Sequence, residues 1–191
     1  MPDEASERLR SHDVTLEDGP LRLRPMTEND WPVVMQWTTD PDVLYYSEGD
    51  DVSSRTLEET QMIYRGVSRE AFVFMAELDG EPIGDCWLQR MNLERILDRY
   101  PGKSLWRIDL QIGAKNLWGK GWGTRIIRLL IRHAFSECDA DAVFGCDIAD
   151  YNPRSRRAFE KNGFVVDAVV PQPEGRKSKV DYDMILMREG F

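Results

Sequence analysis

The feature that most constrains this chain is a strand, a glycine-rich loop and a helix that follow one another between Arg107 and Arg132. In IDLQI, residues 108–112, apolar and polar side chains alternate with the period of two expected of a strand. The loop WGKGWGT, residues 118–124, has glycines at alternate positions, and the apolar residues after it recur at helical spacing. Such a loop lets the backbone approach a ligand closely, and the free N–H groups at the helix start suit a phosphate or pyrophosphate. A tight turn without a ligand is the alternative interpretation.

A second segment favours the ligand. The loop is not a Walker loop, because GK is not followed by Ser or Thr. It is not a Rossmann motif either, because the downstream acidic residue and the series of parallel strands are missing. In NPRSRRAFEKNGF, residues 152–164, Asn152 can cap a helix, Pro153 suits its first position and Gly163 its end. Together the glycine loop and this helix resemble the acetyl-coenzyme A site of the GNAT N-acetyltransferases.

The resemblance covers roughly residues 20–188 and extends to the aminoglycoside 6′-N-acetyltransferases of that superfamily. It includes, in order, LRLRPMTENDWPVVMQWTTDPDVLYY, DGEPIG, IDLQIGAKNLWGKGWGT, the strand that holds Asp147, and EGRKSKVDYDMILM. It implies an α/β (α+β) domain with the GNAT fold. In that fold a mixed central sheet of about six to seven strands splays between strands 4 and 5, with helices on both faces.

Local patterns along the chain fit such a mixed domain. We expect helices from Thr27 to Asp40, over 56–67, after the glycine loop and from Pro153. A short turn is expected over 43–46, and 91–104 should be irregular or briefly helical. A hairpin or bent strand over 14–24 and strands over 72–78, 83–89, 108–112, 142–148, 164–170 and 180–187 complete the pattern. A disordered tail over 1–12 and a single domain over 13–191 are expected.

Charge and cysteine content narrow the class of partner. The net charge is −9, from 25 basic and 34 acidic residues, which argues against general binding of nucleic acid or anionic membranes. Acidity is compatible with a cationic substrate, although solubility alone also explains it. Cys86, Cys138 and Cys146 lack metal-ligand spacing, so we expect reduced thiols and no metal site. Without a signal peptide or a long apolar run, a cytoplasmic protein is expected.

The resemblance implies how acetyl-coenzyme A is held. The pantetheine arm would pair, as an added strand, with the backbone of Leu110, Gln111 and Ile112. Asn152 would meet the pantetheine and Arg157 would lie near the nucleotide. Where Trp118 stands the superfamily usually has Gln or Arg, so one polar phosphate contact is absent. The pyrophosphate would bind the backbone amides of Trp118, Gly119, Lys120, Gly121, Trp122, Gly123 and Thr124.

Asp109 is the expected catalytic residue. Its side chain is on the opposite face of the strand from Ile108 and Leu110, and the family's catalytic aspartate occupies this place. A lysine-like ammonium has a reference pKa near 10.4 and is almost fully protonated at pH 7, so the acceptor amine must lose a proton. A nearby carboxylate binds the cation and accepts that proton directly or through water. The alternative is a structural carboxylate paired with Arg107 or Lys115.

Further acidic and aromatic residues are expected to bind the acceptor. Asp147 is a charge in the otherwise apolar strand VFGCDI, and it matches an aspartate that contacts substrate amines in the aminoglycoside enzymes; capping of the next turn is the alternative. Asp181 or Asp183 would complete the anionic pocket, and the sequence does not select between them. Tyr46 matches an aromatic position that lines the sugar site, with core packing as the alternative.

Phe159 stands where GNAT enzymes usually have a tyrosine that protonates the leaving thiolate. Phenylalanine cannot donate a proton, so water or another hydroxyl such as that of Tyr151 would have to do so. His12 and His133 have no partner pattern and are expected at the surface.

These expectations lead to three interpretations. The first is an acetyl-coenzyme A-dependent N-acetyltransferase that acetylates a primary amine of a small cation in a ternary complex, above all the 6′-amine of an aminoglycoside, with antibiotic resistance as one biological role. The second is a GNAT enzyme for a protein N-terminus or a siderophore-type amine or hydroxylamine. The third is a coenzyme A-binding sensor without catalysis, which Phe159 supports and Asp109 opposes. The sequence does not separate a monomer from a homodimer.

Overall fold

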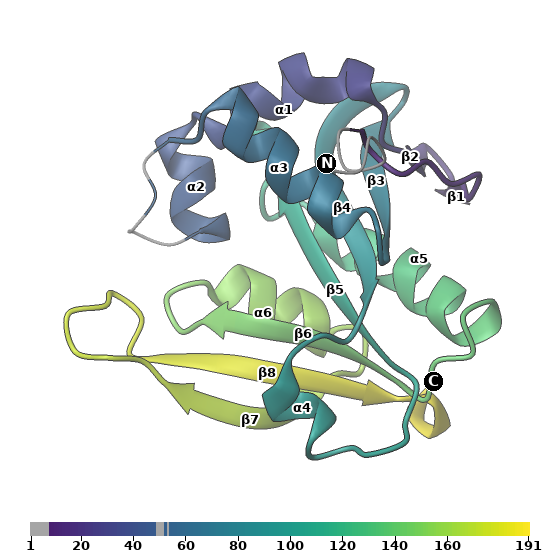
Figure 1. The fold of residues 1–191 in the computed structure, drawn as a ribbon, viewed down its shortest axis with the longest axis vertical. Helices are drawn as coiled ribbons and strands as arrows, with labels where there is room; N and C mark the ends of the chain where they lie inside the picture. Colours follow the sequence, from purple (N-terminus) through teal and green to yellow (C-terminus); the bar gives the residue numbers. More distant parts are fainter. Residues whose placement is uncertain (1–7, 49–51, 53) are drawn as a thin grey trace, which may run out of the picture. The chain divides into compact units, whose positions relative to one another are not determined.

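A computed structural model describes residues 8–48, 52 and 54–191 (Figure 1). Its helices are α1 (Trp31–Thr38), α2 (Pro41–Ser47), α3 (Leu57–Val67), α4 (Glu94–Leu97), α5 (Trp122–Ser136) and α6 (Pro153–Glu160), with 3-10 turns η2 (Glu28–Asp30), η3 (Lys115–Leu117) and η4 (Arg188–Gly190). Its strands are β1 (Leu16–Asp18), β2 (Leu21–Pro25), β3 (Ala71–Leu78), β4 (Glu81–Arg90), β5 (Leu105–Ile112), β6 (Ala142–Ala149), β7 (Val165–Pro171) and β8 (Val180–Met187).

The strands form one mixed sheet of eight strands in the order β1-β2-β3-β4-β5-β6-β8-β7. The expected count of about six to seven was therefore low, since the short strand β1, expected only as part of a hairpin or bent strand, pairs along its whole length with β2. The pair β5 and β6 is parallel, with Leu105 opposite Ala142 and Arg107 opposite Phe144. The pairs β1–β2, β2–β3, β6–β8 and β7–β8 are antiparallel.

Contacts divide the chain into two compact units. The first comprises Met1–Trp87 with Leu110–Lys120, and the second comprises Leu88–Asp109 with Gly121–Phe191. Strands β4 and β5 therefore each contribute residues to both units.

In the first unit, apolar stripes of α1 and α3 pack on strand residues. The core cluster comprises Met26, Trp31, Val34, Trp37, Val43, Tyr64, Val73 and Met75. Thr56 caps α3 by accepting from the N–H of Glu59, whose carboxylate accepts from the N–H of Thr56 at 2.7 Å. Residues 43–46 belong to a helix rather than the expected turn, because the Asp40 carboxylate caps α2 by accepting from the N–H groups of Asp42 and Val43.

The segment before β1 is attached to the first unit. The N–H of Leu9 donates to Glu28 at 2.7 Å, and the N–H of Arg10 donates to Ser68 at 2.9 Å. A ring nitrogen of His12 lies 3.0 Å from the carbonyl oxygen of Val73. These hydrogen bonds, which a local sequence pattern does not show, attach the described part of the expected tail, residues 8–12, to the first unit, and His12 is half-buried there. Residues 1–7 of the expected tail lie outside the described residues.

In the second unit, β6, β8 and β7 lie side by side, with α6 beside β6 (Figure 1). The buried face of α5 includes Ile126, Ile127, Leu130 and His133. His133 is only 8% exposed, so the expectation of a surface histidine was wrong: the residue falls on the apolar stripe of its helix.

Strand β7 is an edge of the sheet and exposes apolar side chains, with Val165 63% and Val169 52% accessible. Between them Asp167 points inward: its carboxylate accepts from the hydroxyl of Tyr100 and pairs with Arg99 at 2.6 Å. The ladder with β8 shifts register between Val166 and Ala168, which indicates a bulge at this aspartate.

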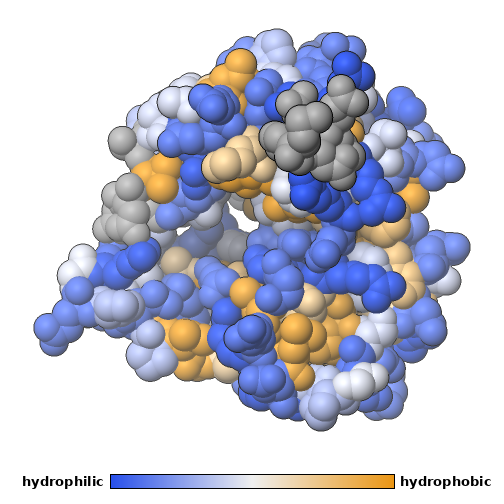
Figure 2. Space-filling model, in the orientation of Figure 1, coloured by the Kyte–Doolittle hydropathy of each residue, from blue (hydrophilic) through white to orange (hydrophobic). Residues whose placement is uncertain are grey.

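The face in Figure 2 is mostly hydrophilic, with separate apolar areas. This agrees with the strongly negative charge and low mean hydropathy of −0.50. Within residues 8–48, 52 and 54–191, no helix is both long and apolar enough to span a membrane.

Candidate active site

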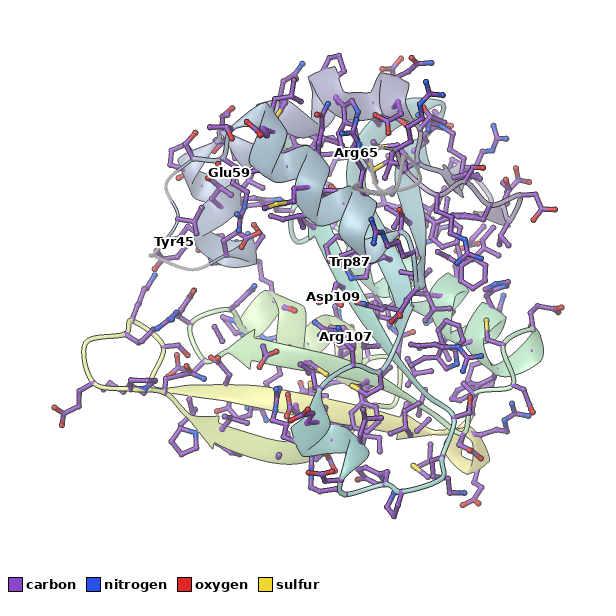
Figure 3. All side chains as sticks on the ribbon, in the orientation of Figure 1. Tyr45, Glu59, Arg65, Trp87, Arg107 and Asp109 are labelled. Atoms are coloured by element: carbon purple, nitrogen blue, oxygen red, sulfur yellow. The ribbon has the colours of Figure 1, made fainter. Side chains whose placement is uncertain are left out.

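Asp109 and Arg107 form a bidentate ion pair on β5. The guanidinium donates from Nε to Oδ2 at 2.8 Å and from Nη2 to Oδ1 at 2.7 Å, and the two side chains lie together in Figure 3. They are two residues apart and therefore share one face of the strand. Because 24% of the Asp109 side chain remains accessible, the carboxylate can still meet a ligand. Lys115, the other expected partner, instead pairs with Asp40 at 2.7 Å and Asp42 at 2.8 Å.

The glycine loop has the backbone of an anion-binding turn. Gly119 and Gly121 have φ angles of 75° and 89°, in the left-handed region that favours glycine. Gly121 is the N-cap of α5, so Trp122, Gly123 and Thr124 form its first turn. The N–H groups of a first turn have no acceptor within the helix and lie at the positive end of its dipole. This local geometry suits a phosphate group.

Trp118 has a structural role in the loop. Its indole Nε1 donates to the carbonyl oxygen of Ile112 at 2.6 Å, and its ring meets Tyr46 edge to face at 5.6 Å between centroids. The loop is therefore folded back onto the end of β5. One carbonyl of the segment expected to pair with pantetheine already accepts this bond. Tyr46, 36% exposed, contacts this loop residue through its ring.

A glycine and a tryptophan fix the chain just before the loop. A Cβ on Gly113 would lie 2.1 Å from the ring of Trp37, so the indole of α1 rests directly on the backbone that follows β5. Only glycine leaves room for this contact. The end of β5 is thereby held by the helical part of the first unit.

Asp85 on β4 is a buried acidic residue that the sequence analysis did not select. It is 1% exposed and accepts hydrogen bonds from the Tyr64 hydroxyl at 2.9 Å and from Nε2 of Gln111 at 2.7 Å. Burial raises the pKa of Asp85 to about 6, against the opposing effect of both hydrogen bonds. The signal was present in PIGDCWL, because a single charge in an apolar strand is the pattern that selected Asp147.

Asp147 occupies an irregular point of β6. Its φ angle is 53°, uncommon for a residue other than glycine, and the ladder with β8 shifts register between Gly145 and Ile148. Its carboxylate accepts from Arg95 at 2.8 Å, and 46% of the side chain is accessible. Burial raises the pKa of Asp147, and the charge of Asp183 adds to this effect while Arg95 opposes it. A raised pKa makes a carboxylate a better proton acceptor near neutral pH.

Asp181 and Asp183, which the sequence left equivalent, have different environments. Asp183 is fully buried and accepts from Arg95 at Nε, 3.1 Å, and at Nη2, 2.8 Å. Asp181 instead accepts from the hydroxyl of Ser178 at 2.6 Å. A fully buried, paired carboxylate does not contact an acceptor directly, so the structure favours a supporting role for Asp183.

The second unit thus gathers acidic residues around Cys146. The charges of Asp183, Asp109 and Asp147 all act on this thiol, and burial is the main cause of its raised pKa. Arg107 is close enough to Cys146 to oppose that rise. Since Asp109 and Asp147 each pair with an arginine, the local excess of negative charge is smaller than the sequence suggested.

The residues of α6 have partly structural roles. Asn152 caps the helix, because its side-chain oxygen accepts from the N–H of Ser155 at 3.2 Å. Arg157 is exposed on the same helix. Phe159 is 3% exposed and packs against Gly145, where a Cβ would lie 2.6 Å from the ring, and against Phe164. The phenylalanine is thus a core residue here.

Comparisons with known proteins agree with these observations. A family model described as an acetyltransferase (GNAT) domain matches residues 20–165. Aminoglycoside N(6′)-acetyltransferase type 1 of Klebsiella pneumoniae is 25% identical over 166 residues, 85% of this chain and 82% of that protein.

Solved structures support the same fold. AAC(6′)-Ib in complex with ribostamycin and coenzyme A is similar with a TM-score of 0.76 and 24% identity, over 90% of this chain and 95% of that chain. Spermidine N-acetyltransferase from Vibrio cholerae, in complex with CoA and spermine, gives 0.72 and 16%, over 91% and 98%.

Proposed function

Because the chain belongs to the GNAT acetyltransferase family, we propose that it moves the acetyl group of acetyl-coenzyme A to a primary amine of a cationic small molecule. The leading acceptor is the 6′-amine of an aminoglycoside, and transfer is direct, within a ternary complex. The observation that carries the choice of a cation is the set of three carboxylates in the second unit, Asp109, Asp147 and Asp183, of which the first two remain accessible. The similarity to an aminoglycoside N(6′)-acetyltransferase supports the choice of acceptor.

The net charge of this group determines the charge that a complementary acceptor carries. Three carboxylates, Asp109, Asp147 and Asp183, are offset by the two guanidiniums of Arg95 and Arg107. One ammonium group would balance the remaining negative charge. Asp183 is buried, which leaves the accessible carboxylates of Asp109 and Asp147 to bind the acceptor. Asp181 and Tyr46 remain proposed contributors to acceptor binding.

In the proposed reaction Asp109 binds the acceptor ammonium and accepts its proton, directly or through water. The neutral amine nitrogen then attacks the thioester carbonyl carbon, a C–N bond forms, and the C–S bond breaks. The nitrogen loses its second proton as the amide forms, and water carries a proton to the leaving thiolate. Arg107 holds both oxygens of the aspartate and so fixes its orientation. Asp147 is the rival proton acceptor, since burial raises its pKa.

The leaving group needs a proton that Phe159 cannot supply. A thiol has a reference pKa near 8.5, so at neutral pH the thiolate of coenzyme A takes a proton from water readily. The position of Phe159 in the core, against Gly145, fits a residue kept for packing.

The proposed cofactor contacts follow the chain. The backbone of Leu110, Gln111 and Ile112 pairs with pantetheine and the amides of Trp118–Thr124 bind the pyrophosphate, while Asn152 and Arg157 contact the pantetheine and the nucleotide. The left-handed glycines and the first turn of α5 support the second of these contacts. We place the reaction in the cytoplasm, where Cys86, Cys138 and Cys146 remain reduced.

Release of the coenzyme A thiol tests this proposal. Purified protein and acetyl-coenzyme A are mixed with kanamycin, a 6′-hydroxyl aminoglycoside, spermidine, a hydroxylamine or N-terminal peptides. We expect release with kanamycin and none with the 6′-hydroxyl analogue, because only the former offers a 6′-amine. Turnover confined to a peptide or a hydroxylamine would overturn the acceptor. Tight cofactor binding without turnover on any amine would identify a sensor instead of an enzyme.

A further inference from the structure

The buried cluster of Asp85, Tyr64 and Gln111 has no part in the chemistry above. It joins three elements of the first unit, β4, α3 and β5, through a carboxylate that is 1% exposed. A buried carboxylate costs free energy unless its oxygens are hydrogen-bonded. Here one oxygen accepts from the Tyr64 hydroxyl and the other from the Gln111 amide, both neutral donors. Such a costly group calls for an explanation beyond packing.

Gln111 is held at two points. A Cβ on Gly84 would lie 2.1 Å from the carbonyl oxygen of Gln111, so the backbones of β4 and β5 meet there without a side chain between them. The next residue, Asp85, holds the side-chain amide of the same glutamine at 2.7 Å. The dipeptide Gly84-Asp85 therefore fixes both the main chain and the side chain of one β5 residue.

Aromatic packing fixes the third member. Tyr64 is 5% exposed and meets Trp31 and Trp87 edge to face, at 6.0 and 5.7 Å between centroids. Its hydroxyl also lies 3.3 Å from Nε2 of Gln111. The carboxylate thus has one rigid donor, Tyr64, and one donor on the strand, Gln111.

We propose that Asp85 is a positioning residue for acetyl-coenzyme A: through the side chain of Gln111 it fixes the backbone of Leu110–Ile112, on which the pantetheine arm pairs. The inference rests on the proposed function, because it needs the cofactor to use this segment. Asp85 is buried and does not touch the cofactor. Without the Asp85 carboxylate, Leu110–Ile112 would stay in the strand but fluctuate more. Ordering this segment would then cost more conformational entropy when the pantetheine arm binds.

The same cluster gives cofactor binding a pH dependence. The pKa of Asp85 is raised to about 6, mainly by burial, with a smaller contribution from the charge of Glu48, just after α2. Cys86 is its neighbour on β4, and Arg55, before α3, acts on Tyr64. Protonation of the carboxyl removes its charge and one acceptor position, which weakens its hold on Gln111. Affinity for the cofactor therefore falls as the pH drops through about 6.

Calorimetric titration with dephospho-coenzyme A between pH 5 and 8 tests the inference. This probe lacks the phosphate monoester of coenzyme A, which itself would titrate near pH 6. For Asp85→Asn we expect about tenfold weaker binding at pH 7.5 and a flat profile through pH 6. For Tyr64→Phe the midpoint should move to higher pH, because the Tyr64 hydrogen bond lowers the pKa of Asp85. KM for the acceptor amine should change little in either variant.

Asp30→Asn is the matched control. Asp30 is a second buried carboxylate of the same unit, 7% exposed, but it is bound by Arg24 and Thr27. It should lower the melting temperature without changing the affinity for dephospho-coenzyme A or its pH profile. If Asp85→Asn behaves like this control, the inference is wrong while the proposed function stands. If the wild-type chain does not bind the probe at all, the proposed function fails first.

Discussion

The guanidinium of Arg107 holds both carboxylate oxygens of Asp109, at 2.8 and 2.7 Å, and the two residues lie on one face of the same strand. A carboxylate held in this way by two charge-assisted hydrogen bonds has a fixed orientation. The arrangement suits a residue that first binds an ammonium group. The Arg107 side chain is only 15% accessible, and the ion pair with Asp109 compensates for the burial of its charge.

Asp109→Asn should reduce kcat by about a hundredfold to ten-thousandfold, because the amide cannot accept the amine proton. Stability should change little in comparison, since asparagine keeps the shape of the side chain. Steady-state kinetics with the best acceptor, alongside thermal unfolding, measure both. Asp42→Asn is the control, because it removes a carboxylate from another ion pair, with Lys115 at 2.8 Å. Near-normal kcat in Asp109→Asn would transfer the proton-accepting role to Asp147.

Arg95→Met should destabilise the chain by about 3–5 kcal/mol, because it leaves the buried carboxylate of Asp183 without its cation. Asp183→Asn in the same chain should restore part of this loss, since the buried charge is then gone. Urea unfolding of the two variants and the wild type measures the effect. Equal stability of Arg95→Met and the wild type would show that Asp183 is not held as a charged group.

Asp85 should make the chain more stable at mildly acidic pH than at neutral pH, relative to Asp85→Asn. Its pKa is raised from 3.8 to about 6 in the folded state, so folding favours the protonated form. This favourable contribution is full below pH 4 and is lost as the pH rises through 6. A shift of about 2 pKa units corresponds to roughly 3 kcal/mol. Urea unfolding of both chains at pH 4.5–7.5 gives the difference, and a constant difference over this range would contradict the raised pKa.

Gly113→Ala and Gly121→Ala should both destabilise the chain, but for different reasons. The methyl group at Gly113 would overlap the Trp37 ring, and overpacking of this kind costs about 1–3 kcal/mol or more in unfolding free energy. At Gly121 the space is open, and the cost, about 1–2 kcal/mol, comes from the φ angle of 89°. Thermal unfolding and cofactor titration separate them: the first variant should mainly lose stability, and the second should also lose cofactor affinity. Unchanged affinity in Gly121→Ala would remove the loop from the cofactor site.

Local patterns predicted most elements, since the strands and helices of this chain carry regular alternation and clear caps. The helix over Pro41–Ser47 was not expected, because Pro41 reads equally as the end of one helix or as the first position of the next. The buried position of His133 follows from its place on the apolar face of α5, which becomes apparent only when the helical spacing of the whole segment is considered.

The candidate site was less predictable because its partners are distant in the chain. Arg95, which pairs with Asp147 and Asp183, comes from a segment expected to be irregular or briefly helical, 52 and 88 residues away. The difference between Asp181 and Asp183 depends on which of them faces this arginine. Asp85 depends on Tyr64 and Gln111, 21 and 26 residues away. A sequence shows the charged residue in each case, but not the group that holds it.

The inward turn of Asp167 on β7 has a further consequence for the exposed edge of the sheet. Its carboxylate is engaged by Arg99 and Tyr100, and the bulge beside it interrupts the regular ladder with β8. An inward charge and a bulge both discourage a foreign strand from extending a sheet. The strand that exposes Val165 and Val169 therefore also contains its own protection against fibrillar self-assembly.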